Sequence, residues 1–285
     1  MARKINIAKF FLMIMSSGYV IKKLQGKVNQ AIYGYNLIDQ NDKIMVGLSG
    51  GKDSYALLDL LVNRRKALPV KFELHACHVQ ATDMTYRADI EFMERYCAKN
   101  DVKFHLREII VEYNPDDRKP ACFICSWKRR RMLFTTTCET GCNKLALGHH
   151  LDDAIETLLL NMINHSSISS IPPKLSMFNG EIFLIRPLTT CLDKELEKYS
   201  RIMGFPPQKE QCQFDKDTQR NTVRELIRHM EQMNRDARKN LYRSMQNIFD
   251  EYIVTKPRKK VSQLSPGLHH EQKQQSKNFQ TTKQH

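Results

Sequence analysis

The sequence predicts an α/β fold in which a parallel β-sheet carries helices on both faces and is followed by a basic helical extension. Three observations predict it. Short apolar segments alternate with helix-like segments from residue 43 onward, a glycine turn joins the first such pair, and an arginine-rich helical pattern begins near residue 218. This alternation is typical of parallel sheets, because the crossover between parallel strands is long enough to hold a helix.

The expected elements follow in chain order. Residues 5–37 should start irregularly and continue as an amphipathic helix. We expect strands over 43–48, 70–79, 102–111, 144–148 and 182–186, and helices over 55–61, 86–99, 129–140, 152–164 and 193–203. Residues 166–181 are expected to form a loop, and 218–252 a long helical region with a break near Asn234.

These elements group into four segments. They are an N-terminal helical segment (1–40), a nucleotide-binding domain that carries a Cys-x2-Cys insertion (41–205), a loop with a further cysteine followed by the basic helical region (206–254), and a disordered basic tail (255–285). The tail is rich in Gln, Lys and Ser, and its few apolar side chains cannot build a core.

The charge of the chain indicates a polyanionic partner. Net charge is +14, and residues 255–285 contribute +6 of it, because they hold seven Lys/Arg and one Glu. The remaining residues therefore still carry +8. A folded body this basic most simply binds nucleic acid. Charge kept for solubility is the alternative.

The composition argues against two other classes. Eight cysteines in 285 residues do not form the pattern of a secreted disulfide scaffold. No segment approaches the roughly 20 apolar residues of a membrane span. Residues 1–15 imitate the start of a signal peptide, but no small-residue cleavage pattern follows cleanly. We expect a cytoplasmic protein without a membrane partner.

Residues 49–54 read Ser-Gly-Gly-Lys-Asp-Ser between an apolar strand and the start of a helix. Glycines let the backbone approach an anion, the amide N–H groups point at it, and the helix N-terminus adds partial positive charge. Ser49 and Ser54 can donate hydroxyls, and Lys52 supplies a cation. The spacing is not that of a Walker A loop. We predict a phosphate-binding loop; a chance glycine turn is the alternative.

A second motif with several polar side chains, Gly-His-His-Leu-Asp-Asp, occupies residues 148–153 at the end of another predicted strand. Asp152 and Asp153 open a helix, and two carboxylates can hold Mg²⁺ against the phosphates of a nucleotide. In the alternative, the carboxylates only cap the helix and the histidines pack locally. The pairing with the phosphate loop favours a site, because ligands of such folds lie at the carboxyl ends of the strands.

The third string is Cys122-Phe-Ile-Cys125, followed by basic residues. Three hypotheses compete for it: a zinc site completed by Cys138 and Cys142, a redox dithiol, and an iron–sulfur cluster completed by a distant cysteine. For the cluster, the best distant cysteine is Cys212, which lies in a polar loop. Spacing alone does not decide among the three.

The order of these strings is similar to that of one family. The phosphate loop, Cys-x2-Cys with arginines, Gly-His-His-x-Asp-Asp, Pro-Pro-Lys-Leu at 172–175 and Ile-Arg-Pro-Leu at 185–188 together resemble the tRNA 2-thiocytidine synthetases over about residues 20–252. These are PP-loop sulfurtransferases that act in the tRNA anticodon loop. The resemblance implies a Rossmann-like fold of the PP-loop (adenine nucleotide alpha hydrolase) type.

The resemblance also implies a reaction. ATP·Mg²⁺ adenylates the C2 oxygen of a tRNA cytidine, expected at position 32, and sulfur then displaces AMP. In this family three cysteines hold a [4Fe-4S] cluster whose fourth iron is open to sulfur. A cysteine desulfurase would donate sulfur, with a thiol reductant and a homodimer as further expectations.

The resemblance assigns residues to these roles. By position, the cluster ligands are Cys122, Cys125 and Cys212, and Asp153 is the candidate Mg²⁺ ligand. The candidate catalytic residues are Lys52, Asp53, Asp152 and Asp153. The candidate ATP-binding residues are Ser49, Gly50, Gly51, Lys52, Asp53, Ser54, Gly148 and His149. The candidate tRNA-binding residues are Lys128, Arg129, Arg130, Arg220, Arg224 and Arg228, for which a solvated helix face is the alternative.

One departure bears on the target base. The family's third cysteine lies in a Pro-Cys-x-x-Cys segment, whereas Gln211-Cys212-Gln213-Phe214 lacks the second cysteine. The pattern Thr218-x-Arg220-x3-Arg224 also resembles a related branch of the superfamily. Thiolation of another base, lysidine-type ligation, and a non-catalytic metal-binding protein that binds nucleic acid therefore stand as alternatives.

Overall fold

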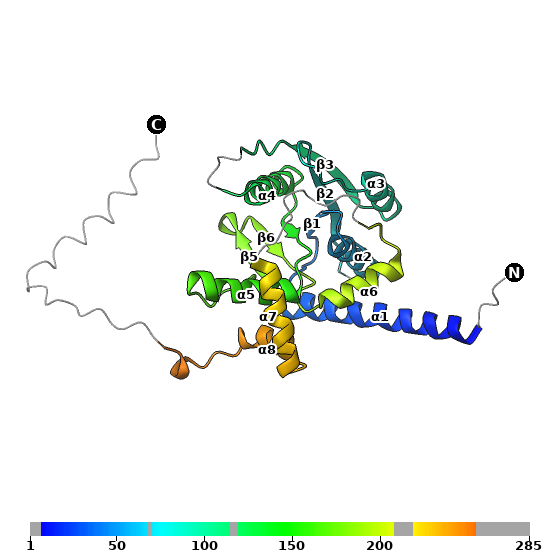
Figure 1. The fold of residues 1–285 in the computed structure, drawn as a ribbon. Coiled ribbons are helices and arrows are strands. Elements are labelled where there is room, and N and C mark those ends of the chain that lie inside the picture. The colour runs from blue at the N-terminus through cyan, green and yellow to red at the C-terminus, as the bar shows by residue number, and fades with distance from the viewer. Residues whose placement is uncertain (1–6, 68–69, 115–118, 208–218, 255–285) are drawn as a thin grey trace, which may run out of the picture. The chain divides into compact units, whose positions relative to one another are not determined.

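The computed structural model describes residues 7–67, 70–114, 119–207 and 219–254 (Figure 1). Its centre is a six-stranded sheet in the order β3-β2-β1-β4-β6-β5. The strands are β1 (Lys43–Gly47), β2 (Glu73–Ala81), β3 (Lys103–Ile109), β4 (Lys144–Ala146), β5 (Lys174–Met177) and β6 (Ile182–Ile185). All neighbours pair in parallel except β5 and β6, which are antiparallel.

Helices cover both faces of the sheet, as predicted. They are α1 (Ile7–Gly34), α2 (Lys52–Ala67), α3 (Ile90–Lys99), α4 (Ala121–Glu139), α5 (Leu151–His165), α6 (Asp193–Met203), α7 (Gln219–Met233) and α8 (Ala237–Ser244). Two 3-10 turns, η1 (Phe178–Gly180) and η2 (Asp250–Tyr252), complete the described elements. The predicted α/β fold is confirmed, with one antiparallel strand added to a sheet expected to be parallel.

Side chains of alternate sheet residues build two cores. Ile44 and Val46 of β1 belong to the larger core, which packs against α1, α2, α3 and α6. Met45, between them, belongs to the core under α4. Successive strand residues point to opposite faces, so a strand buried on both faces is apolar at every position. A third apolar cluster joins α5, α7 and α8 beside the sheet.

Several element boundaries differ from those expected. The loop expected over 166–181 contains β5, whose short, half-exposed sequence lacks a strong strand pattern. Helix α4 begins at Ala121 rather than at Arg129, so the Cys-x2-Cys pair lies inside a helix. The break expected near Asn234 separates α7 from α8.

The chain forms two compact units, Met1–Asn247 and Ile248–His285. The sheet and helices α1 to α8 belong to the first, and η2 belongs to the second. The disorder expected for 255–285 concerns residues outside those described. Over the part of the chain that the structure describes, every helix is too short or too polar to cross a bilayer.

Candidate active site

The phosphate loop lies between the carboxyl end of β1 and the first residue of α2. Gly50 has φ +90°, and a Cβ there would lie 2.8 Å from both Ala88 Cβ and Tyr86 Oη. Only glycine fits a position with this φ and so little space. The loop closes on itself, because Ser54 N donates to the carbonyl of Gly51 over 3.1 Å and the Ser49 hydroxyl donates to Ser54 Oγ over 3.2 Å.

Buried polar groups hold this loop from outside. His78 lies on β2 and bonds through Nδ1 to the carbonyl oxygen of Leu48, 2.7 Å away. The hydroxyl of Tyr86 donates to the carbonyl of Ser49. Burial lowers the pKa of His78, since a charged imidazole would lose its hydration there. The loop is therefore fixed at both carbonyls that precede the glycines.

Lys52, the first residue of α2, bridges two carboxylates. Its Nζ lies 2.9 Å from Asp53 Oδ1 and 2.5 Å from Asp193 Oδ1 at the start of α6. Burial opposes the charge of Lys52, but the hydrogen bond that Lys52 donates to Asp193 and the charge of Asp53 outweigh it and raise the pKa of Lys52. Burial raises the pKa of Asp53, an effect that Lys52 and His150 partly offset.

The Gly-His-His-Leu-Asp-Asp segment lies against this loop. A Cβ at Gly148 would lie 3.2 Å from the carbonyl carbon and oxygen of Asp53, so glycine permits the close approach of two backbones. Asp153 Oδ2 accepts a hydrogen bond from the backbone N–H of His150 over 2.9 Å, which caps α5. Asp153 thus caps the helix, which was the alternative to a metal-binding role, and it also lines the cavity described below.

Asp152 has a different environment from Asp153. It is 5% exposed, and its Oδ2 accepts from the backbone N–H of Asp193 over 2.7 Å. Its Oδ1 accepts from Arg238 of α8, whose Nε lies 2.8 Å from Glu231 of α7. Both oxygens of Asp152 are engaged in holding α6 and α8 against α5. A catalytic role for Asp152 remains a prediction that competes with this structural one.

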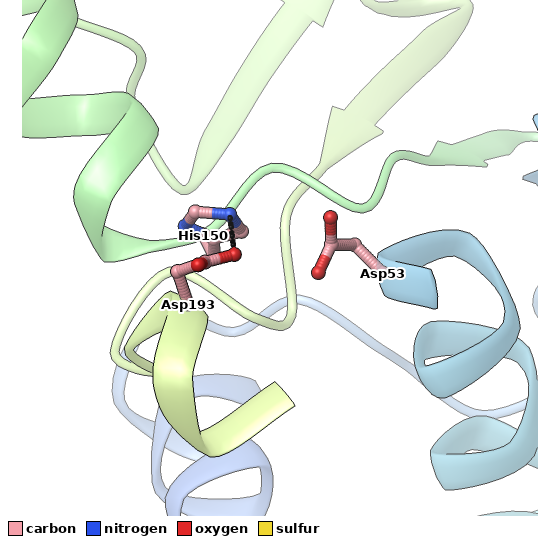
Figure 2. Close-up of side chains that lie close together, drawn as sticks. All are labelled: Asp53, His150 and Asp193. Carbon is pink, nitrogen blue, oxygen red and sulfur yellow. Dashed lines mark ion pairs between the residues drawn. The ribbon is translucent and has the colours of Figure 1, made fainter. Parts of the chain in front are cut away.

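Three side chains form a candidate cation site beside the loop (Figure 2). Ligand atoms of Asp53, His150 and Asp193 lie within 4.8 Å of one another. His150 and Asp193 lie next to each other, with Nε2 3.6 Å from Oδ1, and Asp53 faces them from the start of α2. Two carboxylates at this spacing offer the oxygen ligands that Mg²⁺ prefers.

A cavity of about 550 Å³ is lined by residues of all three predicted motifs: the phosphate loop, the Cys-x2-Cys pair and the Gly-His-His-Leu-Asp-Asp segment. Its lining includes Ser49, Asp53, Ser54, Cys122, Cys125, Arg129, Arg130, Gly148, His149, Asp153 and Arg220. The phosphate loop and the two cysteines are thus neighbours in space although about 70 residues separate them in the chain. The walls between them are apolar and include Val79, Leu133 and Leu147.

The two cysteines occupy the first turns of α4. Residues three apart lie on the same helix face, so both thiols face one side. Cys138 ends the same continuous helix, about 20 Å from Cys125 at 1.5 Å per residue. The hypothesis that Cys122, Cys125, Cys138 and Cys142 share one zinc ion is therefore wrong, because one ion cannot bind ligands that lie that far apart. Cys212 lies outside the described residues.

Four of the six basic residues assigned to tRNA contact other groups of the protein: Lys128, Arg129, Arg220 and Arg224. Arg129 donates from Nε and Nη2 to the carbonyl of Val79 and stacks over the ring of Tyr86, so it holds the cavity wall. Lys128 pairs with Glu112, and Arg224 with Glu156. Arg220 lines the cavity and lies 3.8 Å from both Asp153 Oδ1 and Glu156 Oε2, Arg130 lines the cavity, and Arg228 is exposed on α7.

His149 connects the cavity to β6. Arg186, directly after β6, donates from Nε to His149 Nδ1 over 3.4 Å and from its backbone N–H to the carbonyl of Pro173 over 2.8 Å. Burial lowers the pKa of His149 to about 4, and the charges of Arg186, Arg130 and Arg220 add to this effect. His149 is therefore neutral at pH 7.

Sequence reasoning missed three residues of this site. Asp193 and His150 complete the cation cluster, and Arg186 positions His149. One signal could have found Asp193: like Asp53 and Asp152, it is a carboxylate within the first two residues of a helix that follows a strand end. The parallel order of β1, β4 and β6 brings these three helix starts together.

This fold, with a Ser-Gly-Gly-Lys-Asp-Ser loop between a parallel strand and a helix, defines the class of PP-loop ATP-binding proteins. The model of the PP-loop domain matches residues 20–231. Within that class, the chain belongs to the tRNA-cytidine(32) 2-sulfurtransferase family. The family resemblance predicted from the sequence is confirmed.

Two curated relatives illustrate the relationship. A tRNA-cytidine(32) 2-sulfurtransferase of Polynucleobacter necessarius is 37% identical over 238 residues, which cover 82% of this chain and 78% of the relative. One of Pseudomonas fluorescens is 33% identical over 239 residues, which cover 82% and 86%. Among solved structures, the U34-tRNA thiolase of Methanococcus maripaludis, determined with its [4Fe-4S] cluster, matches with a TM-score of 0.66 at 23% identity and covers 85% and 82% of the two chains. That likeness supports the fold.

Proposed function

We propose that the protein is an ATP-dependent tRNA sulfurtransferase that converts a cytidine, by analogy with its relatives cytidine 32, to 2-thiocytidine. One observation carries the proposal: a single cavity is lined by both the phosphate loop and the Cys122–Cys125 pair. A base that enters this cavity can meet the α-phosphate of ATP on one side and a sulfur carrier on the other.

The reaction has two steps that balance. The C2 oxygen of cytidine attacks the α-phosphorus of ATP, which forms a C–O–P linkage and releases diphosphate. A sulfur nucleophile at the hydrosulfide level then adds to C2, and the C–O bond breaks to release AMP. ATP supplies the leaving group that a carbonyl oxygen lacks, so no electrons need to be transferred.

The loop residues have clear tasks in the first step. Backbone N–H groups of the phosphate loop and the Lys52 ammonium hold the phosphates, since both direct positive charge at the start of α2. Asp53 and Asp193, which Lys52 bridges in this structure, would hold Mg²⁺ when the metal is bound, with Asp153 next to His150 as a further carboxylate; the metal would neutralise phosphate charge. Since Nδ1 of His149 accepts from Arg186, the neutral ring carries its proton on Nε2 and can donate one hydrogen bond at the cavity without adding positive charge.

The cysteines have their task in the second step. Cys122 and Cys125 lie on one face of α4 and fit two positions of a metal cluster, and Cys212 is proposed as the third ligand. A [4Fe-4S] cluster held by these three cysteines would supply an iron site for sulfur binding. The chain's part is to present that position to the cavity and to exclude water with Val79, Leu133 and Leu147. We propose a cysteine desulfurase as sulfur donor and a thiol reductant; dimerisation and a cytoplasmic location remain predictions.

The test is reconstitution without oxygen. The purified protein is analysed for iron, sulfide and zinc, and then incubated with unmodified tRNA, ATP, Mg²⁺ and sulfide. Digestion of the tRNA should give 2-thiocytidine, with one diphosphate for each thionucleoside. Cys212→Ala should lose iron, whereas Cys138→Ala, at the far end of α4, should keep it.

Three results would contradict the proposal. Stoichiometric zinc without iron would remove the cluster. Diphosphate release without a thionucleoside would favour lysidine-type ligation, which also activates a C2 oxygen but needs no sulfur. A thionucleoside other than 2-thiocytidine would keep the enzyme class and change the target base.

A further inference from the structure

Helix α4 carries two exposed aromatic rings next to the cysteines. Phe123 is 50% exposed and Trp127 is 52% exposed. They are four residues apart, so they are neighbours along one face of the helix. Large aromatic side chains usually contribute to a core, so two neighbouring exposed rings suggest a contact surface.

This aromatic face borders the cavity. Cys122 and Ser126 line the cavity, and Phe123 and Trp127 each follow one of them directly. One residue step turns a helix by about 100°. The aromatic face therefore lies beside the cavity wall, within reach of the nucleotides that flank a base bound in the cavity.

Positive charge accompanies both rings. Lys119 Nζ lies 5.0 Å from the centroid of Phe123, and Arg131 Cζ lies 5.7 Å from that of Trp127. From Ala121 to Cys138, α4 contains four basic residues and no carboxylate. Flat rings interleaved with cations match a partner that offers both flat bases and phosphates, which is single-stranded nucleic acid.

We propose that Phe123 and Trp127 form a stacking platform for unpaired loop bases that flank the target nucleotide. This rests on the proposed function and adds how the substrate is held. Proteins read RNA mainly in single-stranded loops, whose splayed bases stack on aromatic rings. The target base enters the cavity, and its neighbours are held outside on the adjacent face of α4.

The test measures binding rather than turnover. A fluorescein-labelled anticodon stem-loop is titrated with the cluster-loaded protein, and anisotropy gives Kd. Trp127→Ala should weaken binding about tenfold, the order of effect seen when one base–aromatic stack is removed, and Trp127→Phe should largely restore it. Phe123→Ala should act in the same direction. Tyr33→Ala is the matched control, since Tyr33 on α1 is 62% exposed and has Arg64 Cζ 4.7 Å from its centroid.

A second arm separates stacking from charge. Abasic substitution of the nucleotides that flank the target removes bases and keeps phosphates. It should weaken binding to the parent protein and have little further effect on Trp127→Ala. Arg131→Ala should lower the slope of log Kd against log salt by about 0.7, as for one phosphate contact in a single strand, whereas Trp127→Ala should leave the slope unchanged.

Tryptophan fluorescence gives a direct measurement of this contact, because Trp127 is the only tryptophan in the chain. Its emission should be quenched when the stem-loop binds. The proposal is overturned if the parent protein does not bind the stem-loop, if its emission does not change on binding, or if Trp127→Ala and Phe123→Ala bind it within twofold of the parent. Failure of the proposed function is a separate result: a parent protein that binds the stem-loop through these rings but forms no thionucleoside.

Discussion

Lys52 and Asp193 form an ion pair that joins the start of α2 to the start of α6, with 2.5 Å between Nζ and Oδ1. The pair connects the phosphate loop, which the sequence makes obvious, to a carboxylate that no motif contains. Asp193 belongs also to the cation cluster with Asp53 and His150. The position of the loop lysine therefore depends on a segment far along the chain.

Asp193→Ala should raise the KM for ATP about tenfold in a diphosphate-release assay. Without this carboxylate, Lys52 loses one of its two partners and the cation cluster loses an oxygen ligand. Glu197→Ala is the control, because Glu197 lies on the same helix and pairs only with exposed Arg201 among the ion pairs described. An unchanged KM in Asp193→Ala would show that Asp193 has no part in ATP binding.

Asp152→Asn should lower the free energy of unfolding by about 2 kcal/mol, since it removes the charge-assisted hydrogen bond to a buried carboxylate and leaves Arg238 with Glu231 alone. Urea unfolding measures this. Asp236→Asn, which removes an exposed pair with Lys239, should leave the urea midpoint nearly unchanged. Full stability together with lost turnover in Asp152→Asn would instead establish the catalytic role.

Gly50→Ala should reduce ATP-dependent diphosphate release at least about 100-fold. The new Cβ would meet Ala88 and Tyr86 at 2.8 Å, and φ +90° disfavours any L side chain, so the loop must change its path. Gly141 is the control for backbone strain alone, because it has φ +66° but nothing within 4 Å of an added Cβ. Gly141→Ala should cost about 1 kcal/mol of stability and leave the KM for ATP unchanged.

The cysteines should differ sharply in reactivity toward iodoacetamide at pH 8 in the cluster-free protein. Burial raises the pKa of Cys77 to about 11 and of Cys97 and Cys191 to about 12, so these thiols stay protonated and covered. Exposed Cys122 and Cys138 should react first. Mass spectrometry of tryptic peptides measures the order.

Cluster reconstitution supplies the control for that experiment. It should protect Cys122 and leave Cys138 reactive. Early labelling of Cys77 or Cys191 would contradict the burial of these residues, and equal reactivity of Cys122 before and after reconstitution would remove it as a ligand.

Stability should fall as pH falls from 6.5 toward 4. His149 has a folded-state pKa of about 4 against an ordinary value of 6.5, so in this window the unfolded chain binds more protons than the folded one. The contribution is fully present above pH 6.5 and is lost on acidification. His149→Gln should flatten the dependence of the urea midpoint on pH, whereas exposed His229→Gln should not. A dependence as steep in His149→Gln as in the parent would contradict the assignment.

The sequence predicts those parts of the molecule that depend on local patterns. An apolar run predicts β1, and six adjacent residues at 49–54 are enough to predict a phosphate-binding loop. The prediction missed strand β5 because its alternating sequence, Lys-Leu-Ser-Met, is only four residues long and directly follows Pro172 and Pro173, a context typical of a loop. The predicted helix began at Arg129 and left out the Cys-x2-Cys pair, although i and i+3 spacing fits the first turns of a helix equally well.

The candidate site shows the same limit. Asp53, Asp153 and the two cysteines carry their chemistry in visible motifs, but nothing local connects them to Asp193. Asp193 comes close to Asp53 because β1, β4 and β6 are adjacent in the sheet. The order of the strands therefore decides this contact, and no single segment of the sequence reveals it. The separate environments of Asp152 and Asp153 likewise follow from the packing of α8, whose Arg238 engages only the first.

The pair of Asp152 and Arg238 also sets an order of events during synthesis. Ribosomes deliver the N-terminal part of a chain first, so the phosphate loop emerges long before Arg238 is translated. Until then Asp152 lacks the charge of Arg238, although its Oδ2 can already accept from the backbone N–H of Asp193 at the start of α6. In a growing chain, Asp152 therefore gains its arginine partner only after α8 has been synthesised, long after the phosphate loop, and truncation before α8 should leave the phosphate loop unchanged in sequence but Asp152 without Arg238.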